Sequence, residues 1–235
     1  MFRFGIGLVI VLAAVAPVAA GPLDITNIEG GWQNEVPLGS ATIVNAAGQG
    51  TDTIRWGTPL SGGTQSGYNF TPAGDLTPVP LGTPFLLGTF QHINEPIGAP
   101  VITSVQYFFS FSTNGIPAGL SDTFNFAHNE TPNASPCPAG STSICDDVVT
   151  VSSVALNQLI TVGTDTFFFN LLGFSKNGGV TIASTFLSPE GGTNTAGLFG
   201  LVTSQPIGVP EPGALVLMLA GLAAGGIRAL RGRIR

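Results

Sequence analysis

Apolar and polar residues alternate along several segments of this chain, with the period of two that is typical of β-strands. The clearest segment has a large apolar residue at every second position, namely Val105, Tyr107, Phe109 and Phe111. Three further segments repeat the pattern, on faces formed by Phe124 and Phe126, by Phe167, Phe169 and Leu171, and by Val180, Ile182 and Phe186. One face of such a segment can be buried while the other meets water, so these segments predict half-buried antiparallel strands.

Shorter runs of the same kind predict further strands, and clusters of Gly, Pro and Asn between them predict turns. The shorter strands are expected at Asp24–Ile28, Ala41–Val44, Thr53–Trp56, Tyr68–Phe70, Phe85–His92, Asp147–Val151, Gln158–Val162 and Leu198–Val202. Two long loops are expected, over Pro72–Pro84 and Asn129–Cys145. Between the two ends of the chain no window has the 3.6-residue period of a helix. The pattern therefore predicts an all-β fold, an antiparallel β-sandwich of jelly-roll-like form.

Residues 1–20 have the composition of a signal peptide. Arg3 supplies a positive start, and Ile6–Ala16 is an apolar run that is too short to span a bilayer. Pro17 ends this run, and small residues follow it. We expect cleavage after Ala20.

Residues 209–235 combine a Pro-Glu-Pro tripeptide, an apolar stretch and a group of arginines. The uncharged run Gly213–Ile227 predicts a membrane-spanning helix over about 213–230, since an arginine near a helix end can reach the lipid headgroups. Clustered arginines stay on the cytoplasmic side, so the rest of the chain is expected outside. The arginines are Arg228, Arg231, Arg233 and Arg235. A permanent anchor and a transient sorting segment both fit this pattern.

The order of these parts, with Pro210, Glu211 and Pro212 before the apolar helix and the arginines, resembles the PEP-CTERM sorting signal of Gram-negative bacteria. The resemblance implies handling by an exosortase, a membrane transpeptidase that would cut near the tripeptide and release or re-anchor the protein. It also implies an exported protein that is held transiently in the inner membrane and then reaches the cell surface or the extracellular matrix.

Removing both ends leaves residues 21–208, enough for one domain with a sizeable core. Five of the seven basic residues lie in the two ends, which leaves Arg55 and Lys176. All of the 13 acidic residues except Glu211 lie in this domain, so 12 acids against two bases give a net charge of −10. Such a surface repels phosphate backbones, which argues against nucleic acid as a partner, whereas it tolerates divalent cations.

The two cysteines, Cys137 and Cys145, are predicted to form a disulfide, because an exported chain reaches an oxidising compartment. The alternative is a metal site, which needs more ligands than this segment holds. The bridge would close a small loop rich in Pro, Gly and Ser, and its role would be structural.

His92 is followed closely by Asn94 and Glu95, and these side chains are candidate metal ligands or an acid–base group. The alternative is a histidine that is hydrogen-bonded at the end of a strand, which is favoured because no second histidine lies nearby in the sequence. His128 lies at the end of another predicted strand and could reach His92 only through the fold.

Asp146 and Asp147 are candidate Ca²⁺ ligands if a further acid and a carbonyl converge on them. Their spacing matches no calcium-loop pattern, and the alternative is a pair of solvated acids at the start of a strand. No other cofactor is expected. The chain also lacks the G-x-S-x-G elbow of a serine hydrolase, and we expect no catalytic residue.

Several short motifs along the domain resemble, in their order, the THxN family of PEP-CTERM proteins, which overlaps the choice-of-anchor K domain. They are Ile54-Arg55-Trp56-Gly57, Gln65-Ser66-Gly67, Gly88-Thr89-Phe90, Asp146-Asp147-Val148-Val149, Leu172-Gly173-Phe174 and Ser188-Pro189-Glu190-Gly191. The T-H-x-N motif reads Gln91-His92-Ile93-Asn94 here, with Thr replaced by Gln. The resemblance implies an exported protein with interchangeable anchoring signals and no established enzyme activity.

These patterns together predict a non-enzymatic, exported protein of the envelope or extracellular matrix, with a structural, adhesive or exopolysaccharide-associated role. Its expected partners are an exosortase-type enzyme, extracellular polysaccharide and, transiently, the inner membrane. The alternative is a carbohydrate-binding or carbohydrate-active domain, with Ca²⁺ as a candidate cofactor. An enzyme should have a cleft with convergent polar groups, which distinguishes the two hypotheses.

Overall fold

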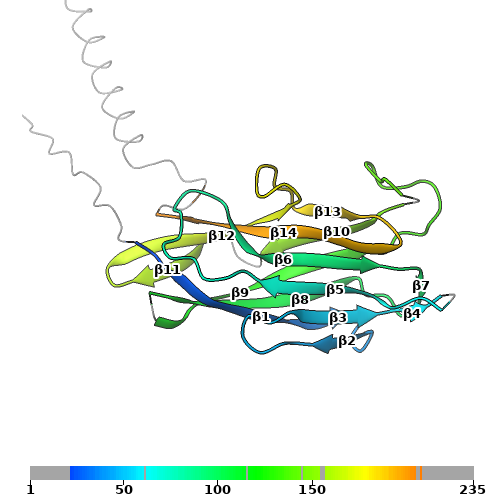
Figure 1. Ribbon diagram of the computed structural model, residues 1–235, viewed down its shortest axis with the longest axis horizontal. Helices are drawn as coiled ribbons and strands as arrows, with labels where there is room; N and C mark the ends of the chain where they lie inside the picture. The colour runs from blue at the N-terminus through cyan, green and yellow to red at the C-terminus, as the bar shows by residue number, and fades with distance from the viewer. Residues whose placement is uncertain are drawn as a thin grey trace, which may run out of the picture.

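Figure 1 shows the protein as a computed structural model. The structure describes residues 22–60, 62–114, 116–143, 145–153, 157–204 and 207. Within these ranges every regular element is a β-strand, and no helix there is long and apolar enough to cross a membrane. The predicted signal peptide with its cleavage site at Ala20 lies outside the described residues, as does the tail with Pro210, Glu211 and Pro212.

The described strands form two large antiparallel sheets and a small one, and the large sheets run along the long axis of the molecule (Figure 1). The five-stranded sheet has the order β1 (Ile25–Val36), β8 (Ser104–Thr113), β9 (Ile116–Asn129), β10 (Asp147–Ser153) and β13 (Thr185–Ser188). The seven-stranded sheet has the order β11 (Gln158–Val162), β12 (Asp165–Ser175), β14 (Gly192–Thr203), β6 (Phe85–Asn94), β5 (Ser66–Pro72), β3 (Asp52–Trp56) and β2 (Ala41–Val44). The two-stranded sheet pairs β4 (Thr58–Pro59) with β7 (Ile97–Gly98).

The two large sheets face each other across a core of aromatic side chains. Phe126 of the five-stranded sheet stacks on Phe90 of the seven-stranded sheet with 5.5 Å between ring centroids, and Phe109 stacks on Phe169 at 6.3 Å. All four rings are buried, and so is Trp32 of β1. Offset or edge contacts between such rings add to the free energy gained by burying their apolar area. The predicted all-β antiparallel fold is confirmed, and this two-sheet arrangement is consistent with a β-sandwich.

The alternating pattern located most strands well. β2 and β11 have the expected bounds, and the inner face of β8, formed by Val105, Tyr107, Phe109 and Phe111, is fully buried as predicted. Leu171 departs from the pattern and is only partly buried, because the register of β12 against β14 shifts between Leu171 and Gly173. Such an irregularity turns a side chain away from the face that simple alternation assigns to it.

The strand face predicted for Val180, Ile182 and Phe186 is wrong in its first half. Val180 is 84% exposed, and the strand β13 begins only at Thr185. A turn replaces the missing part, since the Ser175 hydroxyl accepts a hydrogen bond from the Gly179 amide at 2.9 Å. Local side-chain hydrogen bonds of this kind compete with strand pairing, and hydrophobic alternation does not detect them.

The long connection between β9 and β10 carries the predicted disulfide. Cys137 and Cys145 are bonded to each other, with 4.5 Å between their Cα atoms. The hydroxyl of Thr131, at the start of the connection, donates a 2.6 Å hydrogen bond to the carbonyl oxygen of Cys145 near its end. The connection is thus closed next to Asp147, the first residue of β10.

Candidate functional site

The fold brings together two histidines that are far apart in the sequence. His92 lies on β6 of the seven-stranded sheet, and His128 lies near the end of β9 in the five-stranded sheet. Both side chains point into the space between the sheets, where their ring centroids are 5.3 Å apart in an edge-to-face arrangement. The second histidine that the sequence pattern lacked near His92 is therefore supplied by the opposite sheet.

His92 is fully buried and has no hydrogen-bond partner on either ring nitrogen within the described structure. It packs between Trp56 and Tyr68, with ring centroids 5.9 Å and 5.0 Å away. Burial, together with the neighbouring His128 ring, lowers the pKa of His92 well below its usual value. A buried polar atom without a partner costs about 1–3 kcal/mol, so these two nitrogens are an unusual feature of an otherwise well-packed core.

His128 has partners on both ring nitrogens. Nδ1 lies 2.6 Å from the hydroxyl oxygen of Tyr68, and Nε2 lies 3.2 Å from Oε2 of Glu130. Burial raises the pKa of Tyr68 well above its usual value, and the negative charges of Asp147 and Glu130 act in the same direction. Tyr68 therefore keeps its hydroxyl proton, and its contact fixes the orientation of the His128 ring.

Asp147 presents one carboxylate oxygen to the histidines. Its Oδ1 accepts a 2.9 Å hydrogen bond from the Thr131 amide, whereas Oδ2 has no hydrogen-bond partner and lies 4.0 Å from Nε2 of His128. The residue is fully buried. Burial and the Glu130 carboxylate raise the pKa of Asp147 to about 7, although the hydrogen bonds from Thr131 oppose the shift.

Further acidic groups gather on the outer side of Asp147. One oxygen each of Glu130, Asp147 and Glu190 lie within 4.8 Å of one another. Burial and the Glu130 and Glu95 carboxylates raise the pKa of Glu190. In the described part of the chain these acids form no ion pair with lysine or arginine.

The two basic side chains of the domain are engaged elsewhere. Arg55 donates to the carbonyl oxygens of Ile54 and Tyr68 and to the amide oxygen of Asn69, and burial lowers its pKa. Lys176 donates to the carbonyl oxygen of Leu187. Neither basic side chain of the described domain therefore pairs with the acidic groups of the cluster.

Two overlapping sets of side chains could hold a metal ion. In the first set, His92, His128 and Asp147, one ligand atom from each residue lies within 4.8 Å of the others. The second set is the acidic group of Glu130, Asp147 and Glu190. Asp147 belongs to both sets, and Glu130 connects them through its hydrogen bond to His128. We refer to these five residues as the inter-sheet cluster.

Of the other ligand candidates from the sequence, Asn94 lies on the same face of β6 as His92 but is engaged differently, since its side-chain amide donates to the Ser188 carbonyl oxygen at 2.9 Å. Glu95 belongs to neither set of possible ligands; its backbone amide and carbonyl oxygen both bond the hydroxyl of Ser66.

Asp146 has a structural role in the loop before β10. Its carboxylate accepts hydrogen bonds from the amides and hydroxyls of Thr142 and Ser143. Burial alone would raise the pKa of Asp146, but these hydrogen bonds outweigh it and the pKa lies below the usual value. Asp146 and Asp147 are adjacent in sequence, yet the structure brings only Asp147 to the histidines.

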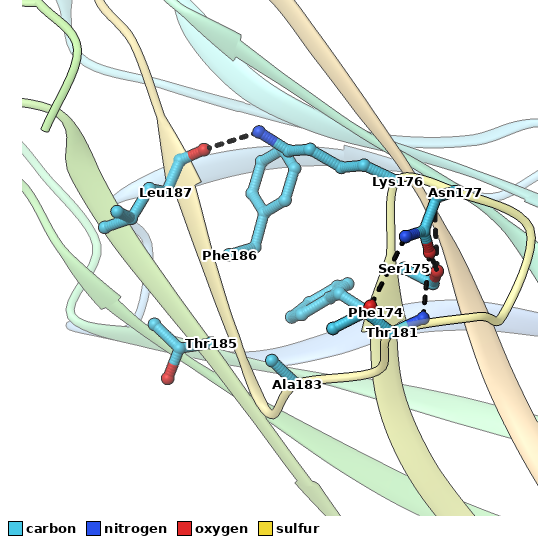
Figure 2. Close-up of a pocket in the computed structure, with 9 residues that line it drawn as sticks. All are labelled: Phe174, Ser175, Lys176, Asn177, Thr181, Ala183, Thr185, Phe186 and Leu187. Carbon is cyan, nitrogen blue, oxygen red and sulfur yellow. Dashed lines mark hydrogen bonds between the residues drawn. The ribbon is translucent and has the colours of Figure 1, made fainter. Parts of the chain in front are cut away.

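The depression in Figure 2 lies beside the end of β12 and β13 and is separate from the inter-sheet cluster. Its volume is about 310 Å³, and its walls include the apolar side chains of Phe174, Ala183 and Phe186. Lys176 lies across it, with Nζ 4.6 Å above the centroid of the Phe186 ring and a 3.2 Å hydrogen bond to the carbonyl oxygen of Leu187 (Figure 2). The one charged group here is thus already engaged within the protein.

A second depression, of about 370 Å³, lies over the inter-sheet cluster. Its lining consists of Leu60, Pro96, Ile97, Glu130, Thr131, Pro132 and Asn133. Glu130 lines this depression and also bonds His128, so it connects the surface with the buried ligand atoms.

Tyr68, Glu130, Thr131 and Glu190 were not among the residues that the sequence assigned to a site. An acid two positions after a strand-end histidine is a signal that could have pointed to Glu130. Tyr68 and Glu190 reach the cluster from distant strands and loops, and single-sequence patterns do not report such convergence.

The sequence matches no family model, and a search of curated proteins finds no match. The resemblances of the tail to PEP-CTERM signals and of the domain to the THxN family therefore stay predictions.

Proposed function

We propose that this chain is a non-enzymatic, exported protein of the cell surface or extracellular matrix of a Gram-negative bacterium, with a structural, adhesive or exopolysaccharide-associated role. The observation that carries the proposal is the burial of the ionisable cluster. His92 and Asp147 have no accessible surface between the sheets, where a substrate could not reach them. Groups placed in this way stabilise and organise a fold, whereas catalysis requires contact with the reacting atoms.

Export is supported by the Cys137–Cys145 disulfide, because such bonds persist in oxidising compartments. It is supported also by the sequence of the two ends. The tail, with Pro210, Glu211 and Pro212, would be read by an exosortase-type enzyme during transient residence in the inner membrane.

For the domain we propose a β-sandwich, which follows from the two facing sheets. The jelly-roll-like form remains a prediction. In a jelly roll, successive strands alternate between the two sheets, whereas β8 pairs with β9 and β11 pairs with β12 as hairpins within one sheet.

Mass spectrometry of the protein from its native host tests the sorting route. We expect the surface fraction to contain a new C-terminus near Pro212, and Glu211→Ala to reduce its formation. Glu29→Ala, which changes an exposed acid of the domain, is the matched control and should leave processing unchanged. Peptides that contain Arg228 to Arg235 in the mature surface fraction would show that the tail is a permanent anchor.

Carbohydrate binding is a second candidate, and the depression over Glu130 favours it. Polar groups of Glu130 and Asn133 lie there beside the apolar surfaces of Leu60 and Ile97, a combination that suits the mixed faces of a sugar. A glycan-array screen of the purified protein, with and without Ca²⁺, tests it. Binding that Asn133→Ala removes would place the ligand at this depression, and the absence of any bound glycan would count against the candidate.

A further inference from the structure

We propose that His92, His128 and Asp147 bind a divalent first-row transition ion, zinc foremost, between the two large sheets, with Glu130 as the fourth ligand. The inference concerns a binding site within the fold and does not depend on the sorting route or on a role at the cell surface. It stands on the geometry of the inter-sheet cluster, on the ligand atoms that are left free there, and on charge.

The free ligand atoms are the first argument. Both ring nitrogens of His92 and Oδ2 of Asp147 are buried and make no hydrogen bond in the described structure. They belong to residues that converge, since one nitrogen of each histidine and one oxygen of Asp147 lie within 4.8 Å of one another. Buried polar atoms are nearly always paired, and several unpaired ones that converge on one point indicate a missing common partner.

The orientation of His128 is the second argument. The Tyr68 hydroxyl engages Nδ1, which leaves Nε2 directed toward Glu130 and Asp147. A neutral histidine that binds a metal through Nε2 carries its proton on Nδ1 and donates it to a neighbouring oxygen, and Tyr68 supplies that oxygen. Metal-binding histidines are typically held in this way.

The position of Asp147 is fixed in a similar manner. The Thr131 amide holds Oδ1 at 2.9 Å, and the Thr131 hydroxyl in turn donates to the carbonyl oxygen of Cys145. The disulfide-closed connection thus holds the carboxylate with Oδ2 toward the histidines. A carboxylate whose second oxygen is already bonded is well prepared to act as a one-oxygen ligand.

Charge is the third argument, and it calls for a cation. Three carboxylates meet in or next to a buried space, and the two basic side chains of the described domain, Arg55 and Lys176, bond elsewhere. Burying carboxylates is unfavourable unless positive charge compensates them. A divalent ion would supply that charge at the point where the ligand atoms converge.

The donor set selects the class of ion. Ca²⁺ and Mg²⁺ prefer sites made of oxygen atoms alone, whereas two imidazoles with carboxylate oxygens suit zinc and its first-row neighbours. His92, His128 and Asp147 supply three ligand atoms within 4.8 Å of one another, and Glu130, whose Oε2 lies 3.2 Å from Nε2 of His128, would complete the tetrahedral set of a structural zinc site. The sequence suggested Asp146 and Asp147 as candidate Ca²⁺ ligands. The site proposed here differs from that expectation both in the ion and in its ligands, and it keeps only Asp147.

The ion would connect the two sheets. His92 comes from β6 of the seven-stranded sheet, whereas His128 and Asp147 come from β9 and β10 of the five-stranded sheet. An ion that binds the folded chain and not the unfolded one would stabilise this arrangement, by an amount that grows with the logarithm of the free ion concentration once this exceeds the Kd.

Zinc titration of the full chain in mild detergent, after treatment with a chelator, tests the proposal. We expect one equivalent of bound zinc by calorimetry and elemental analysis, and a higher unfolding temperature with zinc than with chelator. Cobalt(II) in place of zinc should give the visible absorption of a tetrahedral site, and hyperfine-shifted ring signals of two histidines in its NMR spectrum. These last measurements use the unaltered chain and do not depend on how any variant folds.

Two variants identify the ligands. His92→Gln and Asp147→Asn should weaken zinc binding by more than the roughly 10–100-fold that is typical of losing an outer hydrogen-bond partner, and Tyr68→Phe should fall within that range. Asp52→Asn is the matched control, because Asp52 is also a buried carboxylate but lies at the end of β3 opposite Trp56, which contacts His92. This variant should bind zinc like the unaltered chain. No stoichiometric zinc, histidine signals that do not shift with cobalt, zinc binding unchanged in the two ligand variants, or binding of Ca²⁺ in preference to zinc would each overturn the proposal.

Discussion

The hydrogen bond between Tyr107 and Asp52 provides a test of how this fold holds a buried carboxylate. Tyr107 lies on β8 and Asp52 begins β3, so the bond joins the two large sheets. The tyrosine hydroxyl donates to Oδ2 of Asp52 at 2.6 Å, and the Ala46 amide donates to Oδ1 at 2.7 Å. Asp52 is 1% exposed, so water cannot readily replace the hydroxyl.

Tyr107→Phe removes this donor and keeps the ring. The ring contacts to Trp32 and Phe70, at 4.9 Å and 4.4 Å between centroids, should survive, so no sizeable cavity forms. The cost should then come from the unpaired Oδ2 of Asp52. A hydrogen bond to a charged acceptor contributes about 1.5–3 kcal/mol, and we expect the free energy of unfolding to fall by that amount near neutral pH.

The cost should also depend on pH. Burial raises the pKa of Asp52 above its usual value, although the hydrogen bonds from Tyr107 and Ala46 oppose the shift. A carboxyl whose pKa is higher in the folded state contributes stability that is complete below its unfolded pKa, near 3.9, and is lost as the pH rises through the folded pKa. Without the hydroxyl the carboxylate loses a favourable interaction and its pKa rises further. The cost of Tyr107→Phe should therefore grow as the pH rises from about 4 through the raised pKa of Asp52 in the folded state.

Urea unfolding of the full chain, followed by tryptophan fluorescence at several pH values in this range, measures the effect. Asp52→Asn and the double variant complete a double-mutant cycle. With a neutral amide at position 52, the cost of Tyr107→Phe should be smaller and nearly independent of pH. A cost that is the same at every pH, or that is unchanged in the Asp52→Asn background, would refute the assignment of Asp52 as the charged acceptor.

Two further predictions concern packing and the disulfide. Gly88→Ala should lower the free energy of unfolding in urea by about 1–3 kcal/mol, because an added Cβ would meet the ring of Phe70. Gly74→Ala is the control, since a Cβ there meets open space and should have almost no effect. Equal effects of the two changes would contradict this explanation. Replacing Cys137 and Cys145 by Ser should lower the free energy of unfolding by about 2–3 kcal/mol, as the chain-entropy model gives for a loop of this size. Intact-mass measurement with and without reductant checks the bond, and two free thiols in the native protein would argue against it.

The sequence predicted the strands well where a strand has one buried and one exposed face. β8 is the clearest case, since its large apolar residues all lie on the inner face. The prediction was wrong at Val180, where the side-chain oxygens of Ser175 and Asn177 accept hydrogen bonds from backbone amides and form a turn in place of a strand. The pairing of the strands into sheets was not predictable, because it depends on contacts between segments that are far apart in the chain.

The candidate site was predictable only in part, for the same reason. His92 and Asp147 could be named because of their residue types and their positions at strand ends. Their convergence with His128 depends on the register and facing of β6, β9 and β10, which no local pattern encodes. Neighbours in the sequence were misleading, since Glu95, three positions after His92, and Asp146, next to Asp147, serve other contacts.

Gln91, which stands where the resembled T-H-x-N motif has Thr, lies on the opposite face of its strand from His92. Successive residues of a strand point to opposite faces, so Gln91 lies on the outer face of β6 and His92 on the inner one. On that outer face a row of hydrogen bonds crosses the strands: Arg55 donates to Asn69 at 2.6 Å, and Asn69 donates to Gln91 at 3.0 Å. Gln91 in turn lies 3.5 Å from the hydroxyl of Thr195 on β14. Gln91 therefore belongs to a polar ladder that connects β3, β5, β6 and β14, on the face of the sheet away from the inter-sheet cluster. A longer amide at this position spans the gap between neighbouring strands, which gives a physical reason for Gln here that is independent of any chemistry at His92.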